Sequence, residues 1–90
     1  MRFEWDLAKA ASNLAKHGVS FEQASTVFGD PLSATARDPD HAIREGRWLT
    51  FGMSSDGQLL VVAHADRGGK LRIISARVAT RQERKIYEEG

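Results

Sequence analysis

The chain has no cysteine among its 90 residues, and no apolar run approaches the roughly 18 residues of a membrane span. Without cysteine there is no disulfide, no thiolate nucleophile and no zinc site with sulfur ligands, so stability has to come from packing. The opening residues Arg2 to Asp6 also lack signal-peptide character. We therefore expect a cytoplasmic protein with no membrane partner.

Motifs for common cofactors are missing as well. The sequence contains no GxGxxG, no GxxxxGK and no GxSxG, so dinucleotide binding, P-loop chemistry and a hydrolase nucleophile elbow find no support. None of the three histidines forms an HxH or HxxxH pair. We expect neither a metal nor a cofactor.

The net charge is small, but the charges are unevenly distributed. The formal value is +1, from 13 Lys and Arg against 12 Asp and Glu. One segment of the C-terminal half, whose only acid is Glu83, holds seven cations: Arg67, Lys70, Arg72, Arg77, Arg81, Arg84 and Lys85. This asymmetry predicts a basic face, with ordinary surplus surface charge as the alternative.

Cap residues bound three predicted helices. Asp6 and Gly18 delimit the first helix, whose apolar stripe comprises Leu7, Ala10, Ala11, Leu14 and Ala15. Ser20 with Gln23 starts a second helix, which ends before Pro31. Thr80 with Glu83 starts a third, from Arg81 to about Glu89.

Between the second and third helices the hydrophobic period changes to two. Strands are predicted at 32–37, 47–53, 59–65 and 71–77, with a short opening strand at 2–5. The turns at 55–58 and 67–69 favour antiparallel hairpins. We predict a single α+β domain over residues 1–90, with two N-terminal helices packed on an antiparallel meander of three to four strands and a C-terminal helix. Segment 59–63, apolar on both faces, is its central strand.

Two groups of residues are candidates for chemistry. Lys9, Asn13, Lys16 and His17 share one helix face, either a phosphate-contacting ridge or an ordinary solvated side. His64 near arginines would suit proton transfer, with a structural hydrogen bond as the alternative. In a regular strand Arg72 and Arg77 point to opposite faces. Arginine and histidine without a cofactor suit RNA cleavage by the substrate's own 2′-hydroxyl.

An ordered set of motifs along nearly the whole chain resembles the BrnT ribonuclease toxins of bacterial type II toxin–antitoxin systems. The matching residues are Phe3-Glu4-Trp5-Asp6, Lys9, Asn13, Lys16-His17-Gly18-Val19-Ser20-Phe21-Glu22-Gln23-Ala24, Val27-Phe28, Asp30-Pro31, His41, Glu45, Arg47, Gly52-Met53-Ser54, Val61 to His64, Arg72-Ile73-Ile74-Ser75-Ala76-Arg77, Ala79-Thr80, Glu83-Arg84 and Tyr87.

The resemblance implies a RelE-like fold and metal-independent RNA cleavage that blocks translation, on free RNA or on the ribosome. It also implies a BrnA-like antitoxin with a ribbon-helix-helix domain, and contact with operator DNA only through the antitoxin complex. One departure concerns the family pattern Glu-Glu-Arg, which here is Glu45-Gly46-Arg47. If the second carboxylate orients Arg47 or acts as a base, this chain depends on Glu45 alone.

Together these observations predict an endoribonuclease site. Arg47, Arg72 and Arg77 would neutralise the scissile phosphate and His64 would move a proton, while Lys9, Lys16 and His17 would contact the RNA backbone at the edge. Cations of the last helix would form an outer rim or an antitoxin surface. The alternative is a non-catalytic RNA- or partner-binding module whose arginines form structural ion pairs with Glu83, Glu45 and Asp66. Trp48 and Ile86 are either core residues or docking sites.

Overall fold

The computed structural model describes residues 1–38 and 46–90. Within these ranges the elements are β1 (Phe3–Glu4), α1 (Leu7–His17), α2 (Phe21–Ser25), the 3-10 helix η1 (Thr26–Gly29), β2 (Ala34–Arg37), β3 (Arg47–Met53), β4 (Leu59–Arg67), β5 (Lys70–Val78) and α3 (Arg81–Glu89). The predicted helices and the main strands are confirmed to within a few residues, since the caps that predicted them are formed. Asp6 accepts from Ala8 and Lys9, and Thr80 and Glu83 make a reciprocal capping box.

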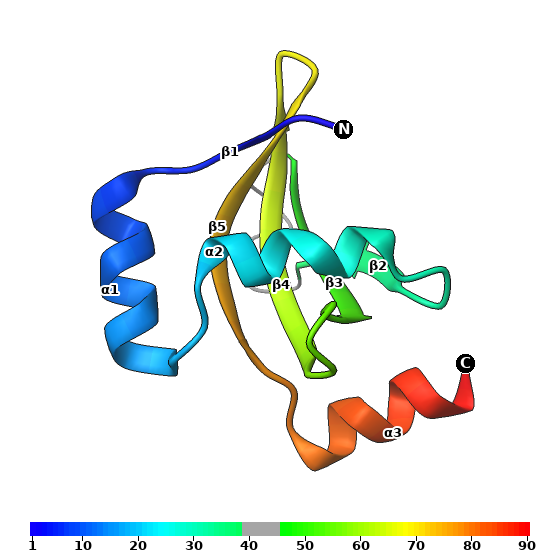
Figure 1. The fold of residues 1–90 in the computed structure, drawn as a ribbon. Coiled ribbons are helices and arrows are strands. Elements are labelled where there is room, and N and C mark those ends of the chain that lie inside the picture. The colour runs from blue at the N-terminus through cyan, green and yellow to red at the C-terminus, as the bar shows by residue number, and fades with distance from the viewer. Residues whose placement is uncertain (39–45) are drawn as a thin grey trace.

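The sheet has five strands in the order β1-β5-β4-β3-β2 (Figure 1). Strands β2 to β5 form the predicted antiparallel meander, but β1 pairs parallel to β5 through Phe3 opposite Leu71 and Glu4 opposite Arg72. The prediction of a purely antiparallel sheet of three to four strands was therefore wrong. A two-residue strand carries too little pattern to reveal its distant partner, so its pairing is a tertiary effect.

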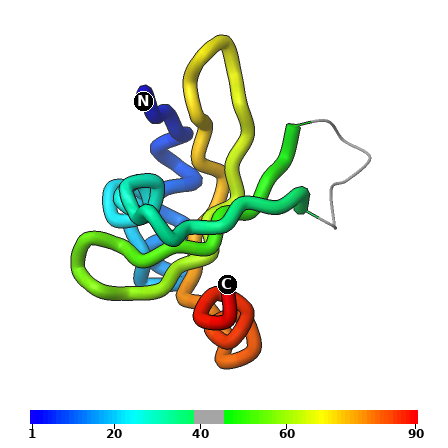
Figure 2. The backbone as a smooth tube through the Cα atoms, turned by 90° about the vertical axis from the view of Figure 1, so that its right-hand side faces the viewer, coloured from blue at the N-terminus to red at the C-terminus, as the bar shows by residue number. Residues whose placement is uncertain are grey.

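Helix α2 and η1 cross one face of the sheet, which we call the helix-covered face; the opposite side is called the open face (Figures 1 and 2). The core lies under these two helices and is formed by Val19, Phe21, Ala24, Val27, Leu60, Val62, Leu71, Ile73 and Ala76. Residues Leu59 to His64 of β4 are buried on both faces, which confirms the prediction of a central strand. Gly52 on β3 permits the close approach of η1, because a Cβ there would lie 3.1 Å from the Val27 carbonyl oxygen.

Helix α1 flanks the edge of β5, and its packing differs from the prediction (Figure 1). Leu7 and Leu14 of the predicted apolar stripe are 81% and 51% exposed, whereas the polar Asn13 is buried. The Asn13 amide donates to the carbonyl oxygens of Ala76 at 2.8 Å and Val19 at 3.0 Å, and its oxygen accepts from the Ala76 N–H at 3.1 Å. Asn13 thus provides hydrogen-bond partners for the backbone N–H and carbonyl of Ala76 on β5, beyond the residues at which β5 pairs with β1.

Helix α3 has no buried residue and is held by polar contacts. The Arg77 guanidinium donates two hydrogen bonds to the Glu83 carboxylate, at 2.7 and 2.8 Å. The Tyr87 hydroxyl donates to Asp30 at 2.5 Å, and Asp30 also accepts from the backbone N–H of Met53. The helix is therefore attached at both of its ends, to β5 and to the loop before β2.

Replacing Asn13 with alanine is expected to destabilise the fold by about 2 to 4 kcal/mol, since it removes three buried hydrogen bonds and leaves the Ala76 N–H and carbonyl unsatisfied. Urea unfolding measures the change. The adjacent exposed Ser12→Ala is the control, and it should shift the free energy of unfolding by less than about 0.5 kcal/mol. Equal stability of the two variants would contradict the role given to Asn13.

The Arg77 contacts, helped by the Thr80 N–H, lower the pKa of Glu83 to about 2. A carboxylate whose pKa is depressed on folding stabilises the protein above its unfolded value of about 4.5 and loses that contribution as pH falls toward 2. Glu83→Gln keeps the capping box and removes the charge, so it should cost about 1 kcal/mol or less at pH 7 and flatten the stability profile between pH 4.5 and 2. Thermal unfolding across this range tests it, and a variant profile parallel to that of the unsubstituted protein would contradict it.

Candidate functional site

A β-bulge in β5 decides which arginines share a face. Ala63 lies opposite Ser75 and His64 lies opposite Ile73, so Ile74 is the extra residue between them. Residues opposite each other on paired strands point to the same side. Arg72 lies opposite Ala65 and Arg77 opposite Val61, and both therefore belong to the open face. The prediction that they point to opposite faces was wrong, because it assumed a regular strand.

Sharing a face does not bring the two arginines together. Ala65 and Val61 are four residues apart on β4, which at about 3.3 Å per residue separates the Arg72 and Arg77 backbones by roughly 13 Å. Arg77 is paired with Glu83 and points to the α3 end of the sheet. Arg72 makes a single contact with Glu4, 3.1 Å from its Nη1 to Oε2, and lies at the other end.

The cations cluster around a cavity at the end of the sheet near the β4–β5 hairpin. This cavity, which we call the sheet cavity, has a volume of about 530 Å³ and is lined by Lys9, Gly46, Arg47, Ala65, Asp66, Arg67, Arg72 and Ile74. Arg47 and Arg72 flank Ala65 on neighbouring strands, since Ala65 lies opposite both. Four cations thus face one space in which Asp66 is the only acid among the described lining residues.

A second cavity of about 200 Å³, the α1 cavity, lies between α1 and the bulge. Its lining comprises Lys9, Ser12, Asn13, Lys16, His17, Ile74 and Ser75. Lys9 and Ile74 line both cavities, so the two lie next to each other along the α1 side of β5, and together they are called the furrow. The predicted ridge of Lys9, Lys16 and His17 therefore borders the furrow. Asn13, on the same helix face, is buried, and its hydrogen bonds to Val19 and Ala76 hold α1 against β5.

His64 does not lie in the furrow. It shares the helix-covered face with Leu60 and Val62, is only 6% exposed, and its ring packs edge-on against Phe28 with centroids 5.0 Å apart. Its Nε2 is 2.7 Å from the Thr50 hydroxyl, which in turn contacts Thr35. Burial lowers the pKa of His64, which favours the neutral imidazole, and the Asp66 charge opposes this shift. The expectation that His64 lies beside the arginines is corrected, and its contacts match the structural hydrogen bond given as the alternative.

Gly46 sits at the sheet cavity with a φ of +80°, a conformation in which an L residue is strained. A glutamate at this position would therefore be strained unless the backbone changed. Glycine adopts this conformation without strain. Glu45 and His41 lie outside the described residues.

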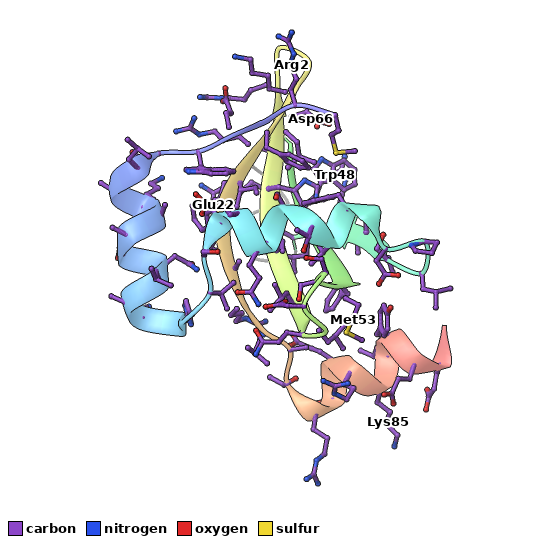
Figure 3. All side chains as sticks on the ribbon, in the orientation of Figure 1. Arg2, Glu22, Trp48, Met53, Asp66 and Lys85 are labelled. Atoms are coloured by element: carbon purple, nitrogen blue, oxygen red, sulfur yellow. The ribbon has the colours of Figure 1, made fainter. Side chains whose placement is uncertain are left out.

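The cations of α3 form a separate rim. Lys85 projects away from the sheet, and Arg84 pairs with Glu88 on the same helix (Figure 3). Ile86 is 60% exposed, so it is not a core residue. Trp48 is half-buried, and the Arg37 guanidinium lies 5.6 Å from its ring centroid.

Sequence reasoning missed Arg67, Ile74 and Ser75 as furrow residues. Arg67 was recognised only as part of the basic segment, because nothing in the local pattern places it at the same cavity as Arg47. The bulge at Ile74 had one usable signal: Ile73-Ile74 are consecutive apolar residues in a strand that otherwise alternates. In the described part of the chain, no three His, Cys, Asp or Glu residues are grouped as metal ligands.

None of the helices in residues 1–38 and 46–90 is long and apolar enough to cross a membrane. A search of curated proteins gave no significant match. Among solved structures, the chain is similar to the crystal structure of the Brucella abortus ribonuclease toxin BrnT, with 23% identity and a TM-score of 0.71 over 90% of this chain and 99% of that one. This likeness concerns the fold.

The family evidence comes from the sequence itself. The family model described as "Ribonuclease toxin, BrnT, of type II toxin-antitoxin system" matches residues 5–83, which include both cavities' linings. The resemblance seen in the motifs is thereby confirmed. The chain belongs to the BrnT family of ribonuclease toxins of type II toxin–antitoxin systems.

Proposed function

We propose that this ribonuclease toxin acts as one domain over residues 1–90, binds the scissile phosphate of RNA in the sheet cavity and cleaves it without a metal, using the RNA 2′-hydroxyl as nucleophile. The observation that carries the proposal is the cluster of Lys9, Arg47, Arg67 and Arg72 around one cavity whose described lining includes a single acid, Asp66. Such a surplus of positive charge matches a phosphodiester backbone and stabilises the added negative charge of a phosphorane.

Arg47 and Arg72 are the residues best placed to hold the phosphate. They come from strands on either side of β4, so rigid elements fix their positions, and guanidinium groups bind phosphate in a bidentate manner. The Glu4 contact holds Arg72 through one nitrogen, and both side chains remain about 28 to 29% exposed. Glu4 thus orients Arg72 without burying it.

Arg77 is assigned a different role. Its two hydrogen bonds to Glu83 and the resulting rise in its pKa fit a structural ion pair, which was the alternative raised from the sequence. His64 is likewise assigned to the fold and not to the reaction. The proposed RNA-binding residues are therefore the cations of the furrow and no longer include Arg77.

The partner protein is inferred from the family. A type II toxin has an antitoxin partner, and we propose a BrnA-like ribbon-helix-helix protein that blocks the furrow and alone contacts operator DNA. The RelE-like fold, action on free or ribosome-bound RNA and the cytoplasmic location belong to the same proposal. An acidic antitoxin segment would complement the cationic cavity.

Arg47→Gln and Arg72→Gln are expected to lower RNA cleavage at least about 100-fold, because each removes a charge that stabilises the transition state. Arg72→Lys should recover only part of the loss. Each Gln variant should also reduce the salt dependence of RNA binding by about one phosphate contact. Growth arrest on expression and cleavage of RNA, with and without ribosomes, are the measurements.

Two matched variants control for charge and for the ion pair. Arg84→Gln removes the same charge on the α3 rim and should leave cleavage within about twofold, as expected for an exposed surface pair. Glu4→Gln removes the carboxylate charge beside Arg72 while keeping the arginine. Full cleavage by both Arg47→Gln and Arg72→Gln would place the phosphate elsewhere.

Cleavage is expected to persist in excess chelator, since the proposed chemistry needs only proton transfer and charge stabilisation. The assay compares EDTA-treated protein with protein supplied with Mg²⁺ or Mn²⁺ on the same RNA. A substrate with a single 2′-deoxy substitution at the cleaved position should resist cleavage. Activity that vanishes with chelator and returns with a metal would contradict the proposal.

A further inference from the structure

We propose that Ala65 is the floor of the phosphate site and determines what fits between the arginines, an assignment that deepens the proposed function and rests on it. Ala65 is half-buried and lines the sheet cavity. It lies opposite Arg47 on β3 and opposite Arg72 on β5. A phosphodiester that contacts both guanidinium groups therefore lies over the Ala65 side chain.

These three residues form one row across neighbouring strands. Residues opposite each other on paired strands point to the same side, so all three side chains belong to the open face. Adjacent strands lie about 4.8 Å apart, which separates the Arg47 and Arg72 backbones by roughly 10 Å. Within this row, only the methyl group of Ala65 stands between the two arginines. The small side chain thus leaves room for an anion between them.

The contacts of the neighbouring residues keep this room open. The row continues to β1, where Glu4 lies opposite Arg72 and its Oε2 is 3.1 Å from Arg72 Nη1. Because β1 and β4 are on opposite sides of β5, this contact holds the guanidinium from the side away from Ala65. Arg67, two residues after Ala65 on β4, adds a third arginine to the lining of the same cavity. Ala65 is therefore bordered by arginines on three sides.

The sheet itself does not require so small a residue at this position. Valine is more favourable in strands than alanine. Val61 occupies the same face of β4, four residues earlier, and is packed there with only 3% of its surface exposed. A valine at position 65 would suit the strand but would place two further methyl groups between Arg47 and Arg72. We attribute the alanine to the space that the anion needs.

A series of side-chain sizes at this one position tests the assignment: Ala65→Ser, Ala65→Val and Ala65→Leu, none of which changes a charge. Binding is measured by fluorescence anisotropy with a 2′-O-methyl RNA, which lacks the nucleophile. Cleavage is measured in single-turnover assays on RNA alone and on ribosomes. Ala36→Val is the matched control, since Ala36 lies on the same face of the sheet, exposed on the edge strand β2 and outside the described cavity lining. Urea unfolding shows that each variant is folded.

We expect Ala65→Ser and Ala36→Val to bind and cleave within about threefold of the unsubstituted protein. Ala65→Val should weaken binding at least about 10-fold and slow cleavage at least about 100-fold, because the added methyl groups displace the phosphate from the arginines. Ala65→Leu should be worse. Full binding and cleavage by Ala65→Val would overturn the assignment, as would equal losses in Ala65→Ser and Ala65→Val. If Ala65→Leu does not fold, the comparison of Ser with Val decides.

A double variant distinguishes a steric block from a general disturbance of the fold. If Ala65→Val displaces the phosphate, Arg72→Gln has little interaction left to remove in that background. The combined variant should then cleave within about threefold of the slower single variant, because both changes remove the same contact. If the valine only disturbs the fold, the two losses multiply. Multiplied losses would therefore also overturn the assignment.

Failure of the proposed function gives a different pattern. If the phosphate does not occupy the sheet cavity, Arg47→Gln and Arg72→Gln bind and cleave like the unsubstituted protein, and side-chain size at position 65 has no effect. If the cavity is correct and Ala65 is not its floor, the arginine variants fail and Ala65→Val remains active. The two proposals are therefore distinguished by the same set of variants.

Discussion

The side chain of Asn13 occupies the place of a missing strand, and the position of α1 depends on it. Strand β1 pairs with β5 only at Leu71 and Arg72, which leaves the Ala76 backbone groups without a ladder partner. Asn13 supplies both a donor and an acceptor to Ala76 and a further donor to the Val19 carbonyl. Because buried backbone groups are costly to leave unpaired, this clamp fixes α1 beside β5 at a defined distance. The furrow exists because α1 is held there by a polar side chain and not by a broad apolar stripe.

The bulge at Ile74 is the second constraint, and it works together with the clamp. One extra residue reverses the facing of every side chain after it, so Ala76 joins the core while Arg77 turns to the open face. Ile74 itself is left at the junction of the two cavities. A regular β5 would have placed Arg77 in the core beneath α2, where an unpaired guanidinium is not tolerated. The bulge thus allows β5 to place its apolar residues in the core and both of its arginines on the open face.

The charged residues of this molecule fall into two groups, those that attach α3 to the rest of the fold and those that surround the sheet cavity. Glu83 and Asp30 pair with Arg77 and Tyr87 and thereby attach a helix that has no fully buried residue. Around the sheet cavity the balance is different, since the described lining residues comprise four cations and one acid, and of these cations only Arg72 has a further partner among the described residues, Glu4. Unbalanced cations repel one another, and a protein keeps them together where an anion is to be bound. This contrast separates the arginine that attaches α3 to the sheet from those that the proposed function assigns to RNA.

Local sequence was sufficient for the elements and for the family. Caps at Asp6, Ser20 and Thr80 and the alternation of residues 47–53 depend on neighbours a few positions away, so they are readable without a structure. The motif order identified the ribonuclease toxin family across residues 5–83. Tertiary structure decided what depends on distant partners: the pairing of β1, the buried side of α1, the faces of Arg72 and Arg77, and the burial of His64. The faces of Arg72 and Arg77 follow from the register shift between β4 and β5, and the buried side of α1 follows from the hydrogen bonds of Asn13, two of which join residues 63 positions apart. The pairing of β1 with β5 and the contacts of His64 with Thr50 and Phe28 likewise join residues far apart in the chain. A periodic pattern fixes which residues alternate, but only the packed structure determines which side each set faces.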